Sequence, residues 1–207
     1  MDIKRFDAII FDLDNTLYPE IKFLEMAYDY IGQLTHMRNP DVPAAEYAAF
    51  LLDNFKAHGR KDLYQAFQER FVLKNFTLED FLNGLRTVPL KPNSLSLYKE
   101  IEEYLRSGQK QKYFVLTNGN PVQQRNKVFS LCLNQCPFVE IVYCDKLGLN
   151  CRKPSPVGLL KLAEIHALVL SEILFVGDDF VDEAAARAAK TQFMHVDTFI
   201  IELKSQK

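Results

Sequence analysis

A chain of 207 residues with a formal net charge of −2 is long enough for one domain, or for one domain with a sizeable insertion. This charge argues against a general nucleic-acid-binding surface, and no run of residues is long and apolar enough to suggest a membrane span. The opening residues, MDIKRF, lead into a strand pattern without the apolar region of a signal peptide. We therefore expect a cytoplasmic protein with no nucleic-acid or membrane partner.

The first predicted element is a buried strand, FDAII, and two carboxylates follow it at Asp12 and Asp14. Residues i and i+2 of a strand point the same way, so both side chains are expected in one small volume. Like charges held that close repel each other unless a cation lies between them or one carboxyl keeps a proton. The pattern therefore indicates chemistry at the end of this strand.

Residues 19 to 92 carry helical patterns and no strand pattern. Helices are predicted over residues 20–37, 41–55, 61–74 and 77–85. Asp41 is expected to cap the second of these helices, and Thr77 with Asp80 is expected to form a capping box at the fourth. Prolines lie at both ends of the block, which we interpret as an inserted all-helical subdomain.

From residue 93 the pattern alternates between helix and strand. Helices are predicted over residues 94–107, 121–133, 155–168 and 182–190, and strands over residues 112–117, 138–144, 172–179 and 192–196. Such alternation predicts a parallel sheet with helices on both faces, an α/β, Rossmann-like core formed by residues 1–18 and 93–207.

Three of the predicted strands end in polar side chains. These are Asp12 with Asp14, Thr117 with Asn118, and Asp178 with Asp179. Ligands of open α/β sheets bind beyond the carboxyl ends of the strands, so we expect these groups to share one site.

The residue types favour a divalent cation and a phosphate group. Asp12, Asp14 and Asp178 offer only hard oxygen ligands, which suit Mg²⁺ better than zinc. Thr117 suits a phosphate oxygen, and Lys153 lies just before a predicted helix where it brings a positive charge to that phosphate. Alone, an Asp-x-Asp pair is often only a turn or a helix cap, but the combination is much more specific.

The motifs resemble those of the haloacid dehalogenase-like (HAD) superfamily. DLDNT resembles its DxDxT signature, and three later motifs follow in the family's order: Thr117 in LTN, Lys153, and GDDFVDE. The helical block is similar to the family's helical C1-type cap. The opening FDLDNTLYP and the later LTNG are similar to the pyrimidine 5′-nucleotidase branch.

The resemblance implies a role for the matching acidic residues. Asp12 would be the nucleophile that forms an aspartyl-phosphate, and Asp14 would act as general acid and then as general base. Mg²⁺ would be held by Asp12, by the backbone carbonyl of Asp14 and by Asp178. Thr117, Asn118 and Lys153 would bind the phosphoryl group.

The resemblance also implies support for the metal from behind its ligands, by Asp179, Asp182 or Glu183. Asp179 replaces a serine that is frequent in the family, and Glu183 stands where aspartate is usual. Lys190 occupies a position that is often glycine, at the end of the last motif's helix.

We therefore expect a Mg²⁺-dependent phosphatase acting on a small phosphorylated metabolite, with a nucleoside monophosphate as a candidate. Sugar-phosphate phosphatases, phosphoglycolate phosphatases and phosphomutases of the same superfamily are alternatives, and a non-catalytic phosphate-binding protein is a further one. A dehalogenase is disfavoured because that branch usually lacks the second aspartate, present here as Asp14.

Four cysteines fall within one short stretch, at Cys132, Cys136, Cys144 and Cys151. A zinc site is conceivable, but the stretch has no CxxC pair and its spacing fits no common zinc finger. We expect reduced and mostly buried thiols.

Overall fold

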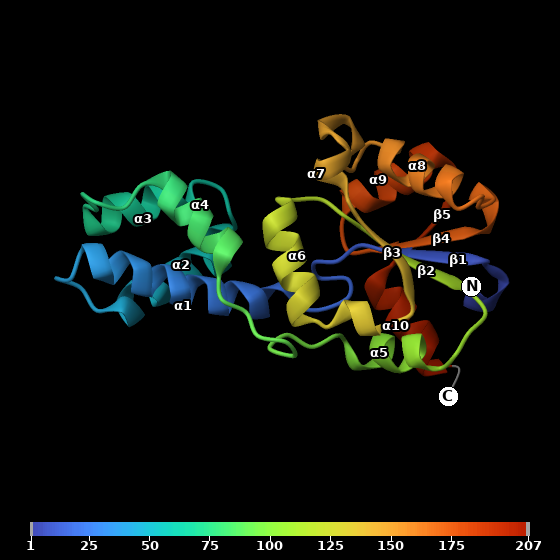
Figure 1. Ribbon diagram of the computed structural model, residues 1–207, viewed down its shortest axis with the longest axis horizontal. Helices are drawn as coiled ribbons and strands as arrows, with labels where there is room; N and C mark the ends of the chain where they lie inside the picture. Colours follow the sequence, from blue (N-terminus) through green and yellow to red (C-terminus); the bar gives the residue numbers. More distant parts are fainter. Residues whose placement is uncertain (1, 206–207) are drawn as a thin grey trace. The chain divides into compact units, whose positions relative to one another are not determined.

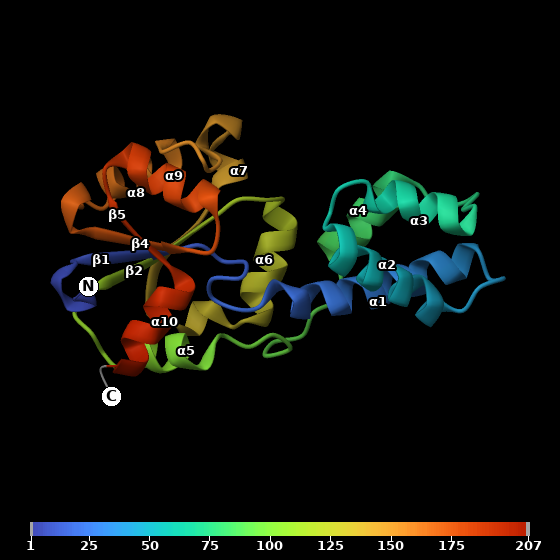
Figure 2. The same ribbon diagram turned by 180° about the vertical axis from the view of Figure 1, so that it is seen from behind.

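The computed structural model describes residues 2–205, and the chain divides into two compact units (Figures 1 and 2). Residues 1–19 and 91–207 form the first, which we call the core unit. Residues 20–90 form the second, the helical unit. In the described part of the chain, no helix has the length and apolar character needed to cross a bilayer.

The core unit is built on a five-stranded parallel sheet with the strand order β3-β2-β1-β4-β5. The strands are β1 (Ala8–Phe11), β2 (Lys112–Thr117), β3 (Phe138–Tyr143), β4 (Ile173–Gly177) and β5 (Gln192–His195). Each predicted strand is present, with its ends shifted by at most two residues. The α/β, Rossmann-like fold class is thus confirmed.

Helices cover both faces of this sheet. They are α5 (Lys99–Arg106), α6 (Pro121–Ser130), α7 (Cys144–Leu147), α8 (Val157–Ile165), α9 (Phe180–Ala189) and α10 (Val196–Ser205). Short 3₁₀ turns occur at η1 (Ile3–Arg5), η2 (Leu133–Gln135), η3 (Leu149–Cys151) and η4 (Leu170–Glu172). Helices α8 and α9 lie on one face, and α5 and α10 lie on the other (Figures 1 and 2).

Alternate residues of β1 enter the two layers of the core. Ala8 and Ile10 belong to a buried cluster that includes Leu159 of α8 and Ala185 of α9. On the other face the ring of Phe11 meets Phe199 of α10, with ring centroids 5.6 Å apart. Strands buried on both faces are apolar throughout, which explains their continuous apolar patterns in the sequence.

Three helices of the core unit differ most from the prediction: α7 and α10 were not predicted, and α5 is shorter than predicted. Helix α10 was missed, although Val196, Phe199 and Leu203 recur at helical spacing and are buried. Helix α5 begins at Lys99 rather than at residue 94, so the predicted helix is several residues too long at its start. The error in α5 concerns an element boundary, where local patterns carry least information.

The helical unit contains α1 (Glu20–Arg38), α2 (Ala44–His58), α3 (Leu63–Phe71) and α4 (Leu78–Thr87), so the four predicted helices are present. The capping box of α4 is confirmed, since Thr77 Oγ1 accepts from the Asp80 backbone N–H and Asp80 Oδ2 accepts from the Thr77 backbone N–H. The expected Asp41 cap is wrong, because α2 begins at Ala44 after Pro43. Proline fixes φ in the range that suits a helix start.

Close contact between α1 and α2 depends on Gly32. A Cβ atom at this position would lie 2.4 Å from the carbonyl oxygen of Ala44. Aromatic rings fill the rest of the unit: Tyr47 and Phe71 have centroids 4.7 Å apart, and Phe67 contacts both rings. The unit therefore has an aromatic core of its own.

Candidate active site

The strand order brings the predicted site residues to one edge of the sheet. Strand β1 lies between β2 and β4, with Phe11 in register with Val115 and Val176. The residues that follow or end these three strands are therefore neighbours at the carboxyl edge. They include Asp12 after β1, Thr117 at the end of β2 and Asp178 after β4.

Three carboxylates form a compact acidic cluster. Asp12, Asp178 and Asp182 each offer one oxygen, and these oxygens lie within 4.8 Å of one another. Asp182, on α9, accepts a hydrogen bond from the backbone N–H of Asp178 through Oδ2 at 3.2 Å. Gly177 makes room for this contact, since a Cβ there would lie 2.4 Å from Asp182 Oδ2.

The acidic cluster shifts the protonation of its members. Burial raises the pKa of Asp12 to about 7, with added repulsion from Asp182 and Asp14, although the Lys153 ammonium opposes the shift. Burial and repulsion from Asp182 also raise the pKa of Asp178, to about 6. Carboxyl groups with raised pKa values are expected where a cation is needed to balance clustered negative charge.

Lys153 is buried against this cluster. Its ammonium group pairs with Asp12 Oδ1 and lies 2.7 Å from Asp182 Oδ1. Burial alone would lower the pKa of Lys153, but the charges of Asp12 and Asp182 raise it above the usual value for lysine. Lys153 is therefore a fixed positive charge beside Asp12.

The loop that carries Lys153 is held in place by Asn118. The Asn118 side chain donates to the Lys153 carbonyl and accepts from the Lys153 backbone N–H, both at 2.9 Å. Asp145 connects the same two loops, because its Oδ1 accepts from the Gly119 N–H and lies 3.2 Å from Arg152 Nε. The Asn118 side chain therefore hydrogen-bonds to the backbone of Lys153 and fixes the loop that carries this lysine.

Asp14 occupies a separate place from the acidic cluster. Its carboxylate receives Lys127 Nζ at 2.7 and 2.8 Å, Gln124 Nε2 at 2.9 Å and the Tyr18 hydroxyl at 2.6 Å. Burial alone would raise the pKa of Asp14, but the Lys127 charge and these hydrogen bonds lower it below its usual value. Asp14 is therefore ionised in this structure at neutral pH.

Thr117 is linked to the same network. Its Oγ1 accepts from Gln124 Nε2 at 2.7 Å and donates to the carbonyl oxygen of Asn118 at 3.2 Å. The side chain is buried at the end of β2. Gln124 therefore connects Thr117 with Asp14.

Two of the predicted supporting residues have other contacts. Asp179 is the N-cap of α9, where its Oδ1 accepts from the backbone N–H of Val181 at 2.7 Å. Glu183 is exposed and pairs with Arg187 at 2.8 Å, one helical turn away. Of the three candidates for metal support, the structure brings Asp182 into the acidic cluster.

Sequence patterns did not predict the site contacts of four residues. Gln124 and Lys127 lie in a predicted helix, and their side chains donate to Asp14, as does the Tyr18 hydroxyl. His195, at the end of β5, has its Nε2 2.9 Å from the Asp178 carbonyl oxygen. The spacing of Gln124 and Lys127 by three residues, on one helix face, is the signal that was available.

The charges of the site fit a divalent cation. The carboxylates of Asp12, Asp178 and Asp182 and the ammonium group of Lys153 leave two excess negative charges when all are ionised. The charge of Asp14 is balanced separately by Lys127. An all-oxygen set of this charge suits Mg²⁺.

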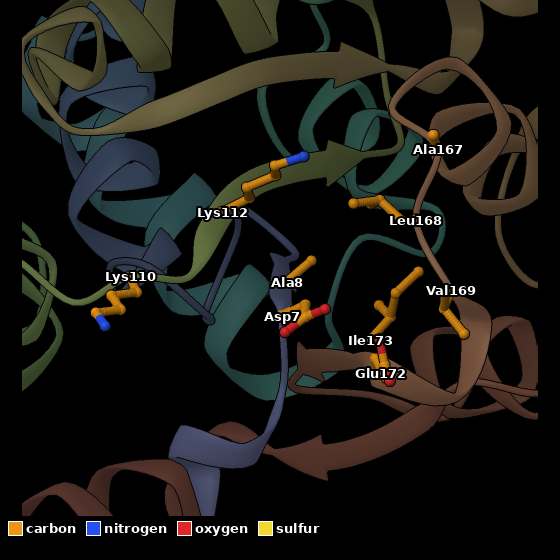
Figure 3. A pocket seen from close by; sticks show the side chains of 9 residues that line it. All are labelled: Asp7, Ala8, Lys110, Lys112, Ala167, Leu168, Val169, Glu172 and Ile173. Atoms are coloured by element: carbon orange, nitrogen blue, oxygen red, sulfur yellow. The ribbon is translucent and has the colours of Figure 1, made fainter.

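A pocket of about 210 Å³ lies at the opposite, amino edge of the sheet (Figure 3). Its lining includes Asp7 and Glu172, with Lys110 and Lys112 nearby. Ala8, Lys112 and Ile173, which begin β1, β2 and β4, also line it. Since none of the motif residues lines this pocket, it is separate from the candidate active site.

The four cysteines are free thiols, and Cys132, Cys144 and Cys151 are buried. Burial raises the pKa of the Cys144 thiol to about 11, so this thiol stays protonated at neutral pH. In residues 2–205, no cysteine joins a group of three or more possible metal ligands.

Comparison with known proteins places these residues in a family. The model of the haloacid dehalogenase-like hydrolases matches residues 6–190. A curated relative, the D-glycero-beta-D-manno-heptose-1,7-bisphosphate 7-phosphatase of Pseudomonas aeruginosa, is 44% identical over 61 residues. That alignment covers 28% of this chain and only about a third, 34%, of the relative.

Solved structures share the fold across nearly the whole chain. A hydrolase from Streptococcus pneumoniae covers 97% of this chain and 99% of its own, with a TM-score of 0.58 at 16% identity. A HAD-superfamily hydrolase from Geobacter sulfurreducens covers 91% and 86%, with a TM-score of 0.62 at 19% identity. A predicted phosphoglycolate phosphatase from Haemophilus somnus covers 98% and 92%, with a TM-score of 0.56 at 20% identity. At such identities the likeness concerns the fold alone, and the family match shows that this chain belongs to the haloacid dehalogenase-like hydrolases.

Proposed function

We propose that the protein is a Mg²⁺-dependent phosphatase that hydrolyses a small phosphomonoester through an aspartyl-phosphate at Asp12. The observation that carries this proposal is the setting of Asp12, which pairs with the Lys153 ammonium and lies beside the carboxylates of Asp178 and Asp182. A carboxylate held beside a fixed cation and a candidate metal site is suited to attack an anionic phosphorus centre. The phosphatase names of the Pseudomonas and Haemophilus proteins agree with this chemistry.

In the first step an oxygen of Asp12 attacks phosphorus, and the bond from phosphorus to the leaving oxygen breaks. The leaving oxygen takes a proton from Asp14. In the second step Asp14 removes a proton from water, the water oxygen attacks phosphorus, and the Asp12–phosphorus bond breaks to release inorganic phosphate.

The environment of Asp14 favours its role as the general base that removes a proton from water. Lys127 and the hydrogen bonds of Gln124 and Tyr18 stabilise the ionised form, which can accept a proton from water. A bound phosphate dianion brings negative charge close to Asp14, and this charge raises the pKa of Asp14 toward the range of a general acid.

Asp12, Asp178 and the backbone carbonyl of Asp14 would hold Mg²⁺, with Asp182 beside them. When bound, the ion neutralises negative charge on the phosphoryl group and on the attacking carboxylate. Lys153 supplies a second positive charge to the same phosphoryl oxygens, and Thr117 supplies a hydroxyl group. The charges of this chain's own residues thus support binding of a phosphate dianion together with the ion.

The helical unit is our candidate for the cap, and we propose that it selects a small metabolite. Nucleoside monophosphates are the first class to test, because the opening FDLDNTLYP resembles the nucleotidase branch. Sugar phosphates and phosphoglycolate are the alternatives. Four free cysteines suit a reducing compartment, and we propose a cytoplasmic location for the enzyme.

The test is a panel of phosphate esters assayed for inorganic phosphate release, with Mg²⁺ and with EDTA. The panel includes nucleoside monophosphates, sugar phosphates, phosphoglycolate, p-nitrophenyl phosphate and a phosphopeptide. We expect release from at least one small ester, its loss in EDTA and its return when Mg²⁺ is added. Full activity in EDTA after exhaustive dialysis would contradict the metal assignment, and no release from any ester would contradict the phosphatase assignment.

A further inference from the structure

Helix α6 has an unusual distribution of polar and apolar side chains. It buries Gln124, Lys127 and Ser130, which recur every three residues along one face. It exposes apolar side chains at Val122 and Phe129, which are 52% and 53% accessible. A surface helix normally turns its apolar face inward, so the polar stripe of α6 must have partners that compensate its burial.

Two residues of this stripe, Gln124 and Lys127, have Asp14 as a partner, whereas Ser130 hydrogen-bonds to Ser94 and to the Leu95 backbone N–H. Lys127 is 1% exposed, and its ammonium group lies 2.7 and 2.8 Å from the two oxygens of the Asp14 carboxylate. Contact with both oxygens restrains the rotation of the carboxylate as well as its position. The Tyr18 hydroxyl, four residues after Asp14 in the chain, donates to Asp14 Oδ1 at 2.6 Å.

Gln124 connects Asp14 with Thr117, the residue proposed to bind phosphate. Its Nε2 donates to Asp14 Oδ2 at 2.9 Å and to Thr117 Oγ1 at 2.7 Å. One face of α6 thus sets the distance between the proposed acid–base group and the hydroxyl proposed to bind phosphate.

We propose that Lys127, assisted by Gln124, is a positioning residue that orients the Asp14 carboxylate for proton transfer. This inference rests on the proposed phosphatase function. A purely structural role explains the geometry less well, because buried ion pairs add little stability compared with apolar residues of similar volume. An ammonium group that contacts both oxygens of a carboxylate gives orientation that an apolar side chain cannot give.

A double-mutant cycle tests whether Lys127 acts through Asp14. The variants are Lys127→Met, Asp14→Asn and the double variant, with Lys99→Met as a control at an 83% exposed lysine on α5. Each is assayed for kcat and KM on an alkyl phosphate and on p-nitrophenyl phosphate. Asp12→Asn reports separately whether the measured activity is that of the proposed site.

We expect Lys127→Met to lower kcat on the alkyl phosphate by roughly 10- to 100-fold, as for other residues that orient a catalytic group, with little change in KM. The loss should be smaller for p-nitrophenyl phosphate, whose leaving oxygen needs less help from an acid. In the Asp14→Asn background the same substitution should cost less than about 3-fold. Lys127→Arg should recover part of the lost kcat, because the positive charge is kept.

Gln124→Met provides a second route if Lys127→Met does not fold, since it removes the neutral donor of the same arrangement. We expect a smaller kcat loss of the same kind, which again disappears beside Asp14→Asn. A raised KM with unchanged kcat, or a loss that persists in the Asp14→Asn background, would show that Lys127 contacts substrate or only supports the fold, and would overturn the proposal. If instead the wild-type protein hydrolyses no ester, or Asp12→Asn keeps the activity, the proposed function itself fails.

Discussion

Asp12 is the residue on which the proposed chemistry depends most directly. The Asp12→Asn substitution keeps the shape of the side chain but removes the nucleophilic oxygen and the charge next to Lys153. We expect a folded protein whose kcat falls by more than about 1000-fold, on the scale seen when a nucleophile is removed. Phosphate release measured beside an exposed aspartate control, Asp53→Asn on α2, checks this prediction. A variant that keeps a tenth or more of wild-type kcat would exclude Asp12 as the nucleophile.

The raised pKa values of Asp12 and Asp178 predict a pH-dependent response to Mg²⁺. Their pKa values in the folded protein, about 7 and about 6, lie above the ordinary value of 3.8. At pH values between about 4 and about 7, the metal-free folded state binds more protons than the unfolded state. The contribution of these two carboxyl groups to the free energy of unfolding therefore falls as pH rises through this range. Mg²⁺ competes with those protons, and its stabilising effect should therefore increase over the same range.

This response is measured as the change in Tm that Mg²⁺ produces, relative to EDTA, at a pH of about 5.5 and of about 8. We expect a clearly larger increase at the higher pH, and a much smaller pH dependence in Asp12→Asn. The same increment at both values would mean that protons and Mg²⁺ do not share these carboxylates.

For single residues, the sequence predicted which side chains lie at the same edge of the sheet, but it did not predict all of their hydrogen-bond partners. Asp12, Thr117 and Asp178 could be placed together because they end strands that were recognised as parallel. The separation of Asp14 from the acidic cluster could not be predicted, since it depends on a buried lysine from a distant helix. Contacts between elements that are far apart in the chain leave no periodic signal in one sequence.

At the scale of elements, α6 shows why a helix can be predicted correctly and its function missed. Its range was predicted within a few residues. Asn120 is the N-cap of the helix, since its side chain accepts from the Val122 backbone N–H, and Pro121 is the first helical residue. The usual rule places its apolar side chains inside, yet Val122 and Phe129 are exposed. The rule fails here because the buried face serves a polar site, as expected where function competes with packing.

The end of α9 gives a prediction about stability. Lys190 follows this helix with φ 60° and ψ 32°, a left-handed conformation that costs a side-chain-bearing residue about 1 kcal/mol relative to glycine. Lys190→Gly should therefore raise the free energy of unfolding by roughly 0.5–1 kcal/mol without changing kcat. Urea denaturation measures the effect.

A matched control is Lys161→Gly in the middle of α8, where the backbone is helical. There the same change should destabilise the protein by about 1 kcal/mol. Destabilisation by Lys190→Gly of similar size would show that the lysine side chain, rather than its backbone conformation, determines how α9 ends.

At the scale of the whole molecule, the two units have different tasks in the proposed reaction. The roles proposed for residues of the core unit concern the phosphoryl group, its metal ion and the leaving oxygen, and not the rest of the substrate. We therefore expect the helical unit, residues 20–90, to determine substrate preference. The fold of the core was predictable because alternating helix and strand patterns restrict its topology, whereas nothing in the pattern of an inserted helical unit specifies a substrate.

An exchange of residues 20–90 with the corresponding unit of a family member of different preference tests this division. The chimera and both parents are assayed on the ester panel. We expect the chimera to hydrolyse p-nitrophenyl phosphate and to adopt the preference of the donor of the helical unit. A folded chimera that keeps the preference of the original core would show that the core selects the substrate.

Trapping the phosphorylated intermediate gives the sharpest test of covalent catalysis by Asp12. A single turnover with Mg²⁺ and the best ester of the panel is quenched in acid, and the peptide containing Asp12 is analysed by mass spectrometry. Covalent catalysis predicts a phosphoryl group on Asp12 that is absent in Asp12→Asn. With p-nitrophenyl phosphate, whose leaving oxygen needs little help from an acid, this adduct should accumulate further in Asp14→Asn, where water activation is impaired. Phosphate release without any adduct in either protein, or an adduct on another residue, would contradict it.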